Sequence, residues 1–293
     1  MRRSAVLGPA VAGTWYPKDR EELAGLVDGL LDRAAARAVA VPGRVTALVA
    51  PHAGLAYSGA VAASAFLKLR GRIFDRIILL GPSHYFNFPG AAITDASTAY
   101  RTPLGDVPID RDAVSALRDA TGFRADDGLF EPEHALEAHL PFLQRALGAG
   151  VPIVPVLLGG RATHDDARRA ADAVAQLIHA STLVVVSSDF THFGSRFGYA
   201  PFHDDVPRKI RALDMGAVAA IEAGDSAAFA RYVDTTGATI CGHRAIDVFL
   251  LLPGAAAGAK LIEYDTSGRM TGTWDHSVSY AAIAVHAAGV AAR

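Results

Sequence analysis

The chain of 293 residues carries a formal net charge of −2, with 51% hydrophobic and 20% charged residues, an ordinary composition for a globular protein with a large core. This balance argues against a nucleic-acid partner, and the absence of any apolar run of roughly 18 residues argues against a membrane-spanning helix. The single cysteine excludes an internal disulfide and favours the reducing cytoplasm, and the short, interrupted apolar stretch at the N-terminus disfavours a signal peptide.

Short runs rich in valine, isoleucine and leucine predict strands, and such continuous runs are typical of strands covered on both faces. The predicted strands are residues 44–50, 76–81, 151–158, 182–187, 260–265 and 278–286. Helical patterns alternate with them, at 19–39 (with Asp19 as N-cap), 58–69, 111–120, 133–147, 165–180, 207–223, 226–235 and 243–252. The alternation predicts an α/β fold: a single three-layer α/β/α domain over residues 1–293, around a mostly parallel central sheet, with 122–130 as a connection.

Two histidines directly follow predicted strands. His52 ends the string VTALVAPH and His84 ends RIILLGPSH, and in each a proline stops the strand because it has no N–H to donate. Open α/β sheets build their sites at the carboxyl ends of the strands. Each histidine alone also fits a turn in which the ring caps a local group, but the repetition of the design favours a site.

A denser group of polar residues, SSDFTHFG, follows the predicted strand at 182–187. Asp189 and His192 are three residues apart, and at a strand-to-helix turn that spacing puts both side chains on one side. Three roles fit Asp189, namely a metal ligand, an acceptor that orients an imidazole, or the cap of the next helix. The roles that fit His192 are a ligand, a general base or a donor to an anion.

The only cysteine, Cys241, lies in TTGATICGHRAI, beside His243 and Arg244. Nearby cations and a helix N-terminus would lower its pKa, which favours a metal ligand or a reactive thiol. The alternative is a small buried hydrophobic residue. Thiolate and neutral imidazole together are natural ligands of a transition metal, so Cys241 and the strand-end histidines predict a mononuclear metal site.

The string EPEHALEAHLPF is expected to begin the helix 133–147, with Glu133 and Glu137 on one face. It contains neither HExxH nor its inverse, so the zinc-protease motif is absent. His134 is expected to reach the pocket. His139 is expected to be a surface residue or a subunit contact.

Three aromatic residues are candidate pocket residues. Trp15 and Tyr16, in AGTWYP, precede the first predicted helix, where they would either fold over a cleft or form a hydrophobic staple. Tyr57, in LAYSG, would also shape the pocket. The chain has no GxGxxG after a strand, no P-loop and no GxSxG elbow, so a nucleotide-binding or serine-hydrolase function has no support.

Taken together and in this order, the strings resemble the Memo family, also called the AmmeMemoRadiSam system protein B family. The matching strings are AGTWYP, APHAGLAYSG, LLGPSHY, EHALEAHLPFL, PVLLG, SSDFTHFG and CGHRAI. The resemblance implies a fold like that of class III extradiol dioxygenases, which hold iron with two histidines and a glutamate. It also implies a metal held by His52, His84 and Cys241, with Asp189 and His192 completing the pocket.

The resemblance further implies iron (Fe²⁺) as the cofactor, with copper or zinc as alternatives, and radical-SAM and AMMECR-type proteins as partners. The resulting hypothesis is a cytoplasmic, metal-dependent oxidoreductase with an unknown small-molecule substrate. His192 would be its acid or base, and Asp189 would hold the tautomer of His192. A non-catalytic metal-binding or peptide-binding module working with those partners is the alternative, and hydrolysis with Cys241 as nucleophile is a third possibility. The sequence leaves the oligomeric state open.

Overall fold

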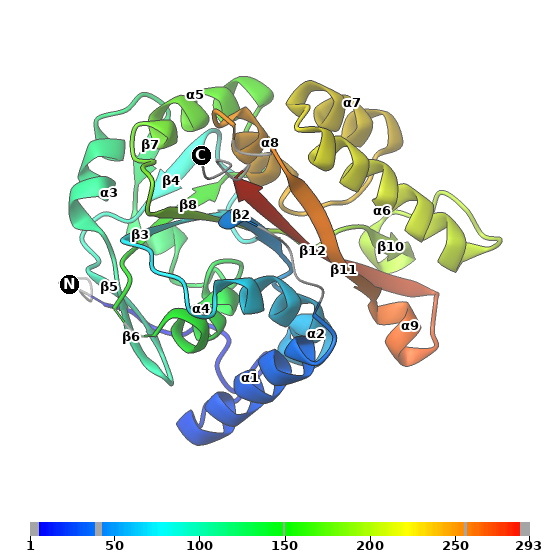
Figure 1. The fold of residues 1–293 in the computed structure, drawn as a ribbon. Helices are drawn as coiled ribbons and strands as arrows, with labels where there is room; N and C mark the ends of the chain where they lie inside the picture. The colour runs from blue at the N-terminus through cyan, green and yellow to red at the C-terminus, as the bar shows by residue number, and fades with distance from the viewer. Residues whose placement is uncertain (1–5, 39–42, 149, 255–256, 288–293) are drawn as a thin grey trace, which may run out of the picture.

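The computed structural model describes residues 6–38, 43–148, 150–254 and 257–287, in which a nine-stranded sheet lies between two layers of helices (Figure 1). The order in the sheet is β10-β12-β2-β9-β3-β8-β4-β7, and β11 also pairs with β12. The predicted three-layer α/β/α domain is therefore confirmed. The strands of the sheet are β2 (Arg44–Ala50), β3 (Arg76–Pro82), β4 (Ala91–Ile93), β7 (Phe123–Ala125), β8 (Ile153–Leu158), β9 (Thr182–Ser187), β10 (His192–Gly194), β11 (Ala259–Thr266) and β12 (His276–Ala287).

The four central strands, β2, β9, β3 and β8, are parallel to one another. Every residue of β8 and β9 is buried because helices cover both faces, which explains their continuous apolar sequences. At the carboxyl edge, Ala50 of β2 is in register with Ser187 of β9. The residues that follow the strands, His52, His84 and Asp189, therefore leave the sheet at one edge.

Antiparallel strands complete the margins of the sheet. β12 pairs antiparallel with β2, β10 and β11, and β4 pairs antiparallel with β8. A second, three-stranded sheet consists of β1 (Val6–Leu7), β5 (Ala99–Thr102) and β6 (Gly105–Pro108). The main sheet is thus parallel at its centre, where the candidate site lies, and mixed at its edges.

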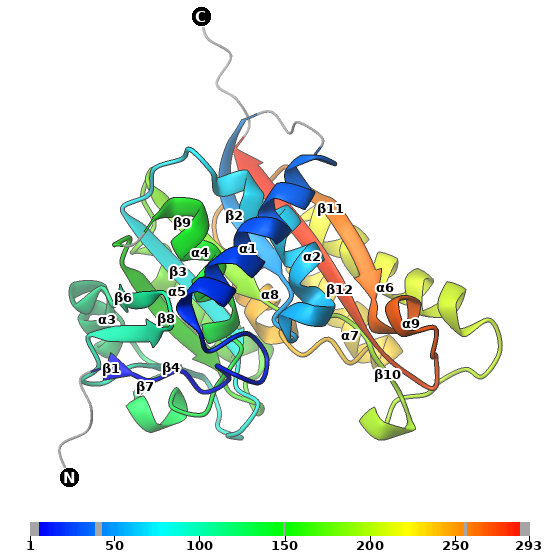
Figure 2. The ribbon, with the colours of Figure 1, turned by 90° about the horizontal axis from the view of Figure 1, so that it is seen from below.

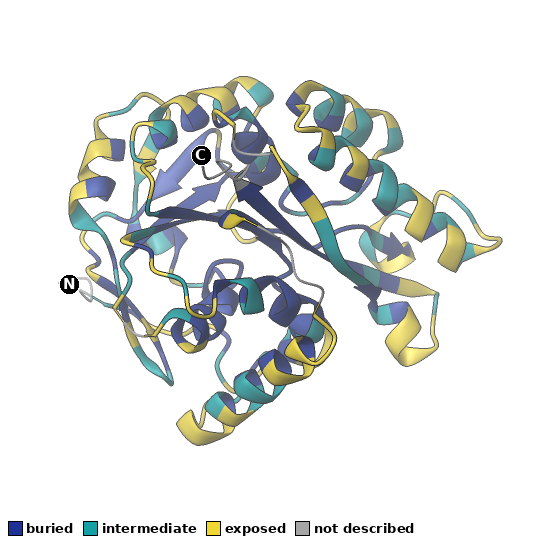
Figure 3. Ribbon diagram, in the orientation of Figure 1, coloured by how far each residue is buried: buried dark blue, intermediate teal, exposed yellow. Residues whose placement is uncertain are grey.

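Helices α1 (Arg20–Ala35), α2 (Leu55–Phe66) and α4 (Leu140–Leu147) pack together on one face of the main sheet. Figure 2 shows α1 and α2 crossing this face, and Figure 3 shows buried residues concentrated in the sheet and on the inner sides of the helices. Nine of the twelve residues of α2 are buried. A Cβ atom on Gly59 of α2 would lie 2.9 Å from Leu30 of α1, so a residue without a side chain permits this close packing.

Helices α5 (His164–Ala175), α7 (Ser226–Thr236) and α8 (His243–Leu251) lie on the opposite face (Figure 1). Helices α3 (Arg111–Arg118), α6 (Val206–Ala223) and α9 (Ser267–Thr271) lie closer to the margins. Among the described residues, no helix combines the length and the apolar character that crossing a bilayer requires.

All six predicted strands are present, with ends within two residues of the predicted ones. The strands that the sequence did not reveal have only two to four residues, namely β1, β4, β5, β6, β7 and β10. The segment 122–130, predicted as a connection, contains β7 and a 3₁₀ turn. Strands this short cannot display an alternating pattern, and their pairing with neighbours far along the chain determines them.

Three predicted helices are clearly shorter than expected, and one of them, predicted at 165–180, ends at Ala175. The helix predicted at 133–147 becomes regular only at Leu140, after a 3₁₀ turn at Glu137–His139. Before that turn the Glu133 carboxylate accepts the backbone N–H of Ala135, which holds the chain in an irregular path. The helix predicted at 19–39 begins after its N-cap Asp19, as expected, but ends at Ala35; residue 39 lies outside the described residues.

His139, expected at the surface or in a subunit contact, is fully buried. Its ring lies 5.6 Å from that of Phe66, and neither ring nitrogen has a hydrogen-bond partner among the described residues. Burial lowers the pKa of His139 to about 3 because the charged imidazolium would lose its hydration. The side chain is therefore neutral in the folded protein at neutral pH.

This burial makes the free energy of unfolding depend on pH. Between its unfolded pKa of about 6.5 and its folded pKa of about 3, His139 binds a proton only in the unfolded chain. The free energy of unfolding is therefore unaffected by His139 above this pH range and falls as the pH drops through it. One such proton contributes a slope of up to about 1.4 kcal/mol per pH unit.

We expect His139→Leu to lose less stability than the parent between about pH 6 and pH 4 and to be near neutral at pH 7, since it replaces an unpartnered polar ring by an apolar side chain. Urea unfolding at several pH values measures this, with His203→Leu at an exposed histidine as the control. Equal losses in the parent and in His139→Leu would contradict the assignment.

Candidate metal centre

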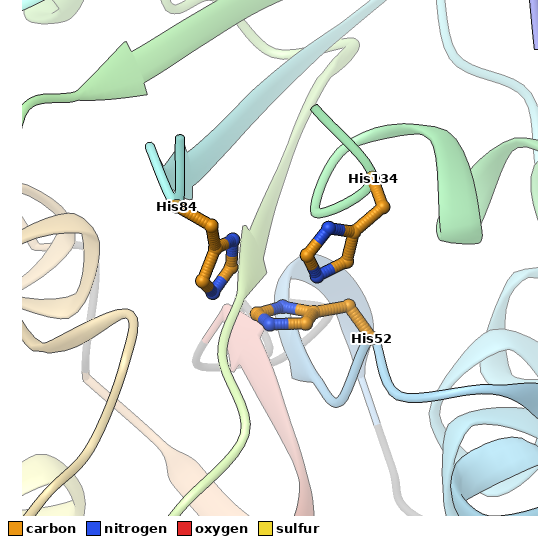
Figure 4. Close-up of side chains that lie close together, drawn as sticks. All are labelled: His52, His84 and His134. Carbon is orange, nitrogen blue, oxygen red and sulfur yellow. The ribbon is translucent and has the colours of Figure 1, made fainter. Parts of the chain in front are cut away.

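Three histidine rings from separate segments converge at the carboxyl edge of the sheet (Figure 4). His52 follows β2, His84 follows β3, and His134 precedes the turn that leads into α4. One ring nitrogen of each lies within 4.8 Å of the others. The ring centroid of His52 is 5.1 Å from that of His84 and 5.5 Å from that of His134. Three imidazoles at this spacing form a donor set of the kind that holds a transition metal.

A chain of hydrogen bonds determines which nitrogen of His52 is free. The Ser187 hydroxyl donates to the Ala135 carbonyl at 2.7 Å, so its oxygen is left to accept from His52 Nδ1, which is also 2.7 Å away. Nδ1 then carries the proton and Nε2 keeps its lone pair. Burial, followed by the neighbouring imidazoles of His84 and His134, holds the pKa of His52 well below its ordinary value. The ring is therefore a neutral potential ligand.

A buried carboxylate fixes His84 in the same way. Glu133 accepts the backbone N–H of His84 at 2.6 Å and lies 2.9 Å from His84 Nδ1, which leaves Nε2 of His84 free. Burial alone would raise the pKa of Glu133, but hydrogen bonds from His84 and from the Ala135 amide outweigh it and lower the pKa. A histidine that donates Nδ1–H to a carboxylate is the usual arrangement around a metal ligand.

His134 supplies the third ring of the group. Its ring lies 4.2 Å from Trp15 and 4.4 Å from His84, and its buried Nδ1 makes no hydrogen bond within the described residues, although it lies 3.5 Å from Glu133 Oε1. Burial and the nearby His84 ring lower the pKa of His134 to about 4. A neutral imidazole with one ring nitrogen within 4.8 Å of those of His52 and His84 fits a metal ion as a third donor.

Cys241 lies beside His52, with its Sγ 3.3 Å from His52 Nε2. The Asp189 amide donates to this sulfur at 3.2 Å. Burial and the nearby Asp189 carboxylate raise the pKa of Cys241 well above its ordinary value, so it is a thiol in the absence of a cation. Among the described residues, the three side chains whose possible ligand atoms all lie within 4.8 Å of one another are His52, His84 and His134. Cys241 is not one of them.

Asp189 and His192 each hydrogen-bond to the backbone rather than to one another. The chain after Asp189 enters β10 rather than a helix, so Asp189 caps no helix; its Oδ1 accepts the backbone N–H groups of His52 at 2.9 Å and Ala53 at 3.3 Å. His192 Nδ1 lies 3.0 Å from the Phe190 carbonyl and 3.1 Å from that of Thr239. These carbonyls, rather than Asp189, hold the tautomer of His192 and leave its Nε2 free.

A cleft of about 480 Å³ lies beside the three imidazoles. Trp15, Tyr57, Asp189 and His192 all line it. Two residues of the cleft wall also contact the imidazole group: the Trp15 ring is tilted at 54° against that of His134, and Asp189 accepts the amide N–H of His52. A small molecule in the cleft would thus lie next to the candidate centre.

Tyr16, expected as a pocket wall, is buried and does not line this cleft. Its hydroxyl donates to the Glu137 carboxylate, which also accepts the backbone N–H of Ala10 at 2.6 Å and of Val11 at 3.1 Å. Burial raises the pKa of Glu137. Glu137 therefore anchors the N-terminal segment that places Trp15 over His134.

Sequence reasoning missed the roles of Glu133 and Ser187 and gave His134 only a general place in the pocket. The proximity of Glu133 to His84 arises from chain segments 49 residues apart. The one local signal for Ser187 is its position at the end of a buried strand, where a hydroxyl must find a partner.

Gly242 lets the Cys241 loop approach the sheet edge. A Cβ atom here would lie 2.4 Å from the Ser187 carbonyl oxygen and 2.5 Å from the Ser188 Cβ. We expect Gly242→Ala to destabilise the protein by about 1–3 kcal/mol and to loosen the contact between Cys241 and His52. Urea unfolding measures the first effect, and alkylation of the single cysteine measures the second, with faster labelling expected.

The control for Gly242→Ala is Gly25→Ala, inside α1, where a Cβ has no atom within 4 Å. This change should stabilise by roughly 0.5–1 kcal/mol because alanine favours a helix. Unchanged labelling and unchanged stability in Gly242→Ala would show that the close approach is not a real constraint.

Comparison with known proteins shows the family of the chain. A family model described as "Memo-like protein" matches residues 8–284. "Protein memo-1 homolog" of Caenorhabditis elegans is 34% identical over 286 residues, covering 92% of this chain and 79% of that protein. "Protein MEMO1" of Homo sapiens and of Danio rerio are each 33% identical over 284 residues, covering 92% of this chain and 94% of the relative. The chain belongs to the Memo-like protein family.

Proposed function

We propose that this protein binds a transition metal through His52 and His84 and acts as a metal-dependent oxidoreductase on a small molecule. The observation that carries the proposal is the state of the imidazoles. Hydrogen bonds at Nδ1 leave Nε2 of both rings unprotonated, and a ring nitrogen of His134 lies within 4.8 Å of those of His52 and His84.

Two side chains compete for the place of third ligand. His134 belongs to the compact imidazole group, and Cys241 lies 3.3 Å from His52 Nε2. The resemblance to Memo-like proteins favours Cys241, while the spacing of the ring nitrogens favours His134. We retain His52, His84 and Cys241 as the proposed ligand set, with His134 as a fourth donor or a substitute for the thiolate.

Imidazole and thiolate donors suit iron(II), copper(I) and zinc, and we propose iron. Such an ion would supply Lewis acidity or, for iron and copper, electron transfer at the edge of the cleft. The chain itself supplies His192, whose Nε2 is free to accept or donate a proton. Asp189 positions the backbone of His52 through two amide hydrogen bonds. A cytoplasmic location, which keeps Cys241 reduced, completes the proposal.

The test is metal binding in protein prepared under reducing, oxygen-free conditions. We expect His52→Ala and His84→Ala each to lose most of the bound iron, because each removes a free Nε2. Glu133→Gln should keep the ligands but weaken metal affinity by about 10–100-fold, since it loosens the hold on His84. Circular dichroism and thermal unfolding show whether each variant folds, and His203→Ala is the control at an exposed histidine.

Two further variants identify the third donor. Loss of iron and of a thiolate-to-metal absorption band in Cys241→Ser, with both retained in His134→Ala, would assign Cys241. The reverse result would assign His134. Full metal content in folded His52→Ala would overturn the ligand assignment. Tight metal binding without any oxygen consumption would instead favour a non-catalytic module, acting with radical-SAM and AMMECR-type partners.

A further inference from the structure

The cleft beside the imidazoles has an unbalanced charge. Arg196, His192 and His276 line it as basic groups. Asp189 is the acid that lines it, and one of its oxygens already accepts the amides of His52 and Ala53. Within the described residues, the Arg196 side chain has neither an ion pair nor a hydrogen bond. An unpaired guanidinium at the mouth of such a cleft favours an anionic group.

Arg196 belongs to a loop whose backbone is closed by hydrogen bonds. Gly194 and Tyr199 close the loop by two backbone hydrogen bonds, of 2.7 and 3.3 Å. Gly194 has a φ of +119°, and a Cβ there would lie 2.3 Å from the carbonyl oxygen of Asp275, so the loop lies tightly against the start of β12. Phe197, next to Arg196, packs edge-on against the His192 ring with centroids 5.1 Å apart. Arg196, whose side chain is exposed, and His192 therefore line the cleft from neighbouring positions of one loop.

Several aromatic side chains also line the cleft. Trp15 and Tyr57 line the cleft together with Phe197. Tyr57 is 48% exposed, although it is a large aromatic residue, and no ring stacks on it among the described residues. Aromatic faces beside a cationic group suit a flat apolar body that bears a negative charge. A volume of about 480 Å³ is within the range of small-molecule sites.

We propose that the cleft binds a small, flat organic anion, with its acid group on Arg196 and its ring between Trp15 and Tyr57. This inference rests on the proposed function in one respect, since it places the ring beside the imidazole group as the substrate of that centre. Arg196 is then the residue that determines specificity for charge. Carboxylates and phosphate monoesters share this chemistry, and the test separates them.

Trp15 can report its own occupancy. The chain has two tryptophans, and the other, Trp274, packs against Gly268 and does not line the cleft. In a Trp274→Phe background, the fluorescence of Trp15 is titrated with benzoate, phenyl phosphate and neutral benzamide. We expect saturable binding of at least one anion and about tenfold or more weaker binding of benzamide, because only the anions pair with the guanidinium. Tighter binding of benzoate would identify a carboxylate as the preferred acid group, and tighter binding of phenyl phosphate would identify a phosphate monoester.

Substitution of Arg196 tests the pairing. Arg196→Gln should weaken anion binding by about tenfold or more and leave benzamide unchanged, whereas Arg196→Lys should restore part of the affinity because it keeps the charge but loses the planar fork. The matched control is Arg231→Gln, at an exposed arginine of α7. Equal affinities for benzoate, phenyl phosphate and benzamide in the parent, or unchanged anion affinity in Arg196→Gln, would overturn the proposal.

The same titrations in metal-free and iron-loaded protein separate this inference from the proposed function. Arg196→Gln should keep the parent's iron content, because Arg196 is not a proposed ligand. Anion binding that depends on Arg196 in a protein that takes up no metal would support the cleft and refute the metal centre. Metal uptake without anion selectivity would do the opposite.

Discussion

The candidate site depends on the shared register of three parallel strands. Because β2, β9 and β3 run in the same direction and are paired side by side, their carboxyl ends meet at one edge. His52, Asp189 and His84 follow these ends within a few residues, so the sheet itself brings them together. Helix packing on both faces buries the strands and keeps that edge rigid, which suits a constellation whose atoms must stay within a fraction of an ångström.

The segment between Glu131 and His139 positions the remaining side chains of the candidate site. It can do so because it does not form a regular α-helix. Its carboxylates point in two directions: Glu133 holds His84, and Glu137 holds the N-terminal segment. Between them His134 joins the imidazole group, and the Ala135 carbonyl accepts from Ser187, which in turn fixes His52. One irregular stretch therefore orients two rings and contributes a third. The helical pattern in its sequence is overridden by these long-range hydrogen bonds.

Much of this could be predicted from the sequence, because the informative features were local. A buried strand followed by proline and histidine identifies His52 and His84, and the six long strands have continuous apolar runs. What could not be predicted depends on partners far along the chain. Tyr16 is buried because of Glu137, 121 residues away, and His192 is oriented by Thr239, 47 residues away. A loop aromatic residue or a histidine has the same local sequence whichever partner it finds. The brief strands β4 to β7 were missed for the same reason.

The tether at Glu137 has a consequence for how the site is protected from water. Trp15 contacts His134, yet its segment is not a strand of the main sheet. The segment is held by three hydrogen bonds to Glu137, by one from the Leu55 amide to the Trp15 carbonyl, and by the buried side chains of Val11 and Tyr16. Such a segment can detach while the sheet remains intact. Solvent exchange at the three imidazoles, and the escape of anything held there, would then be governed by a local opening equilibrium centred on one buried carboxylate rather than by the global stability of the fold.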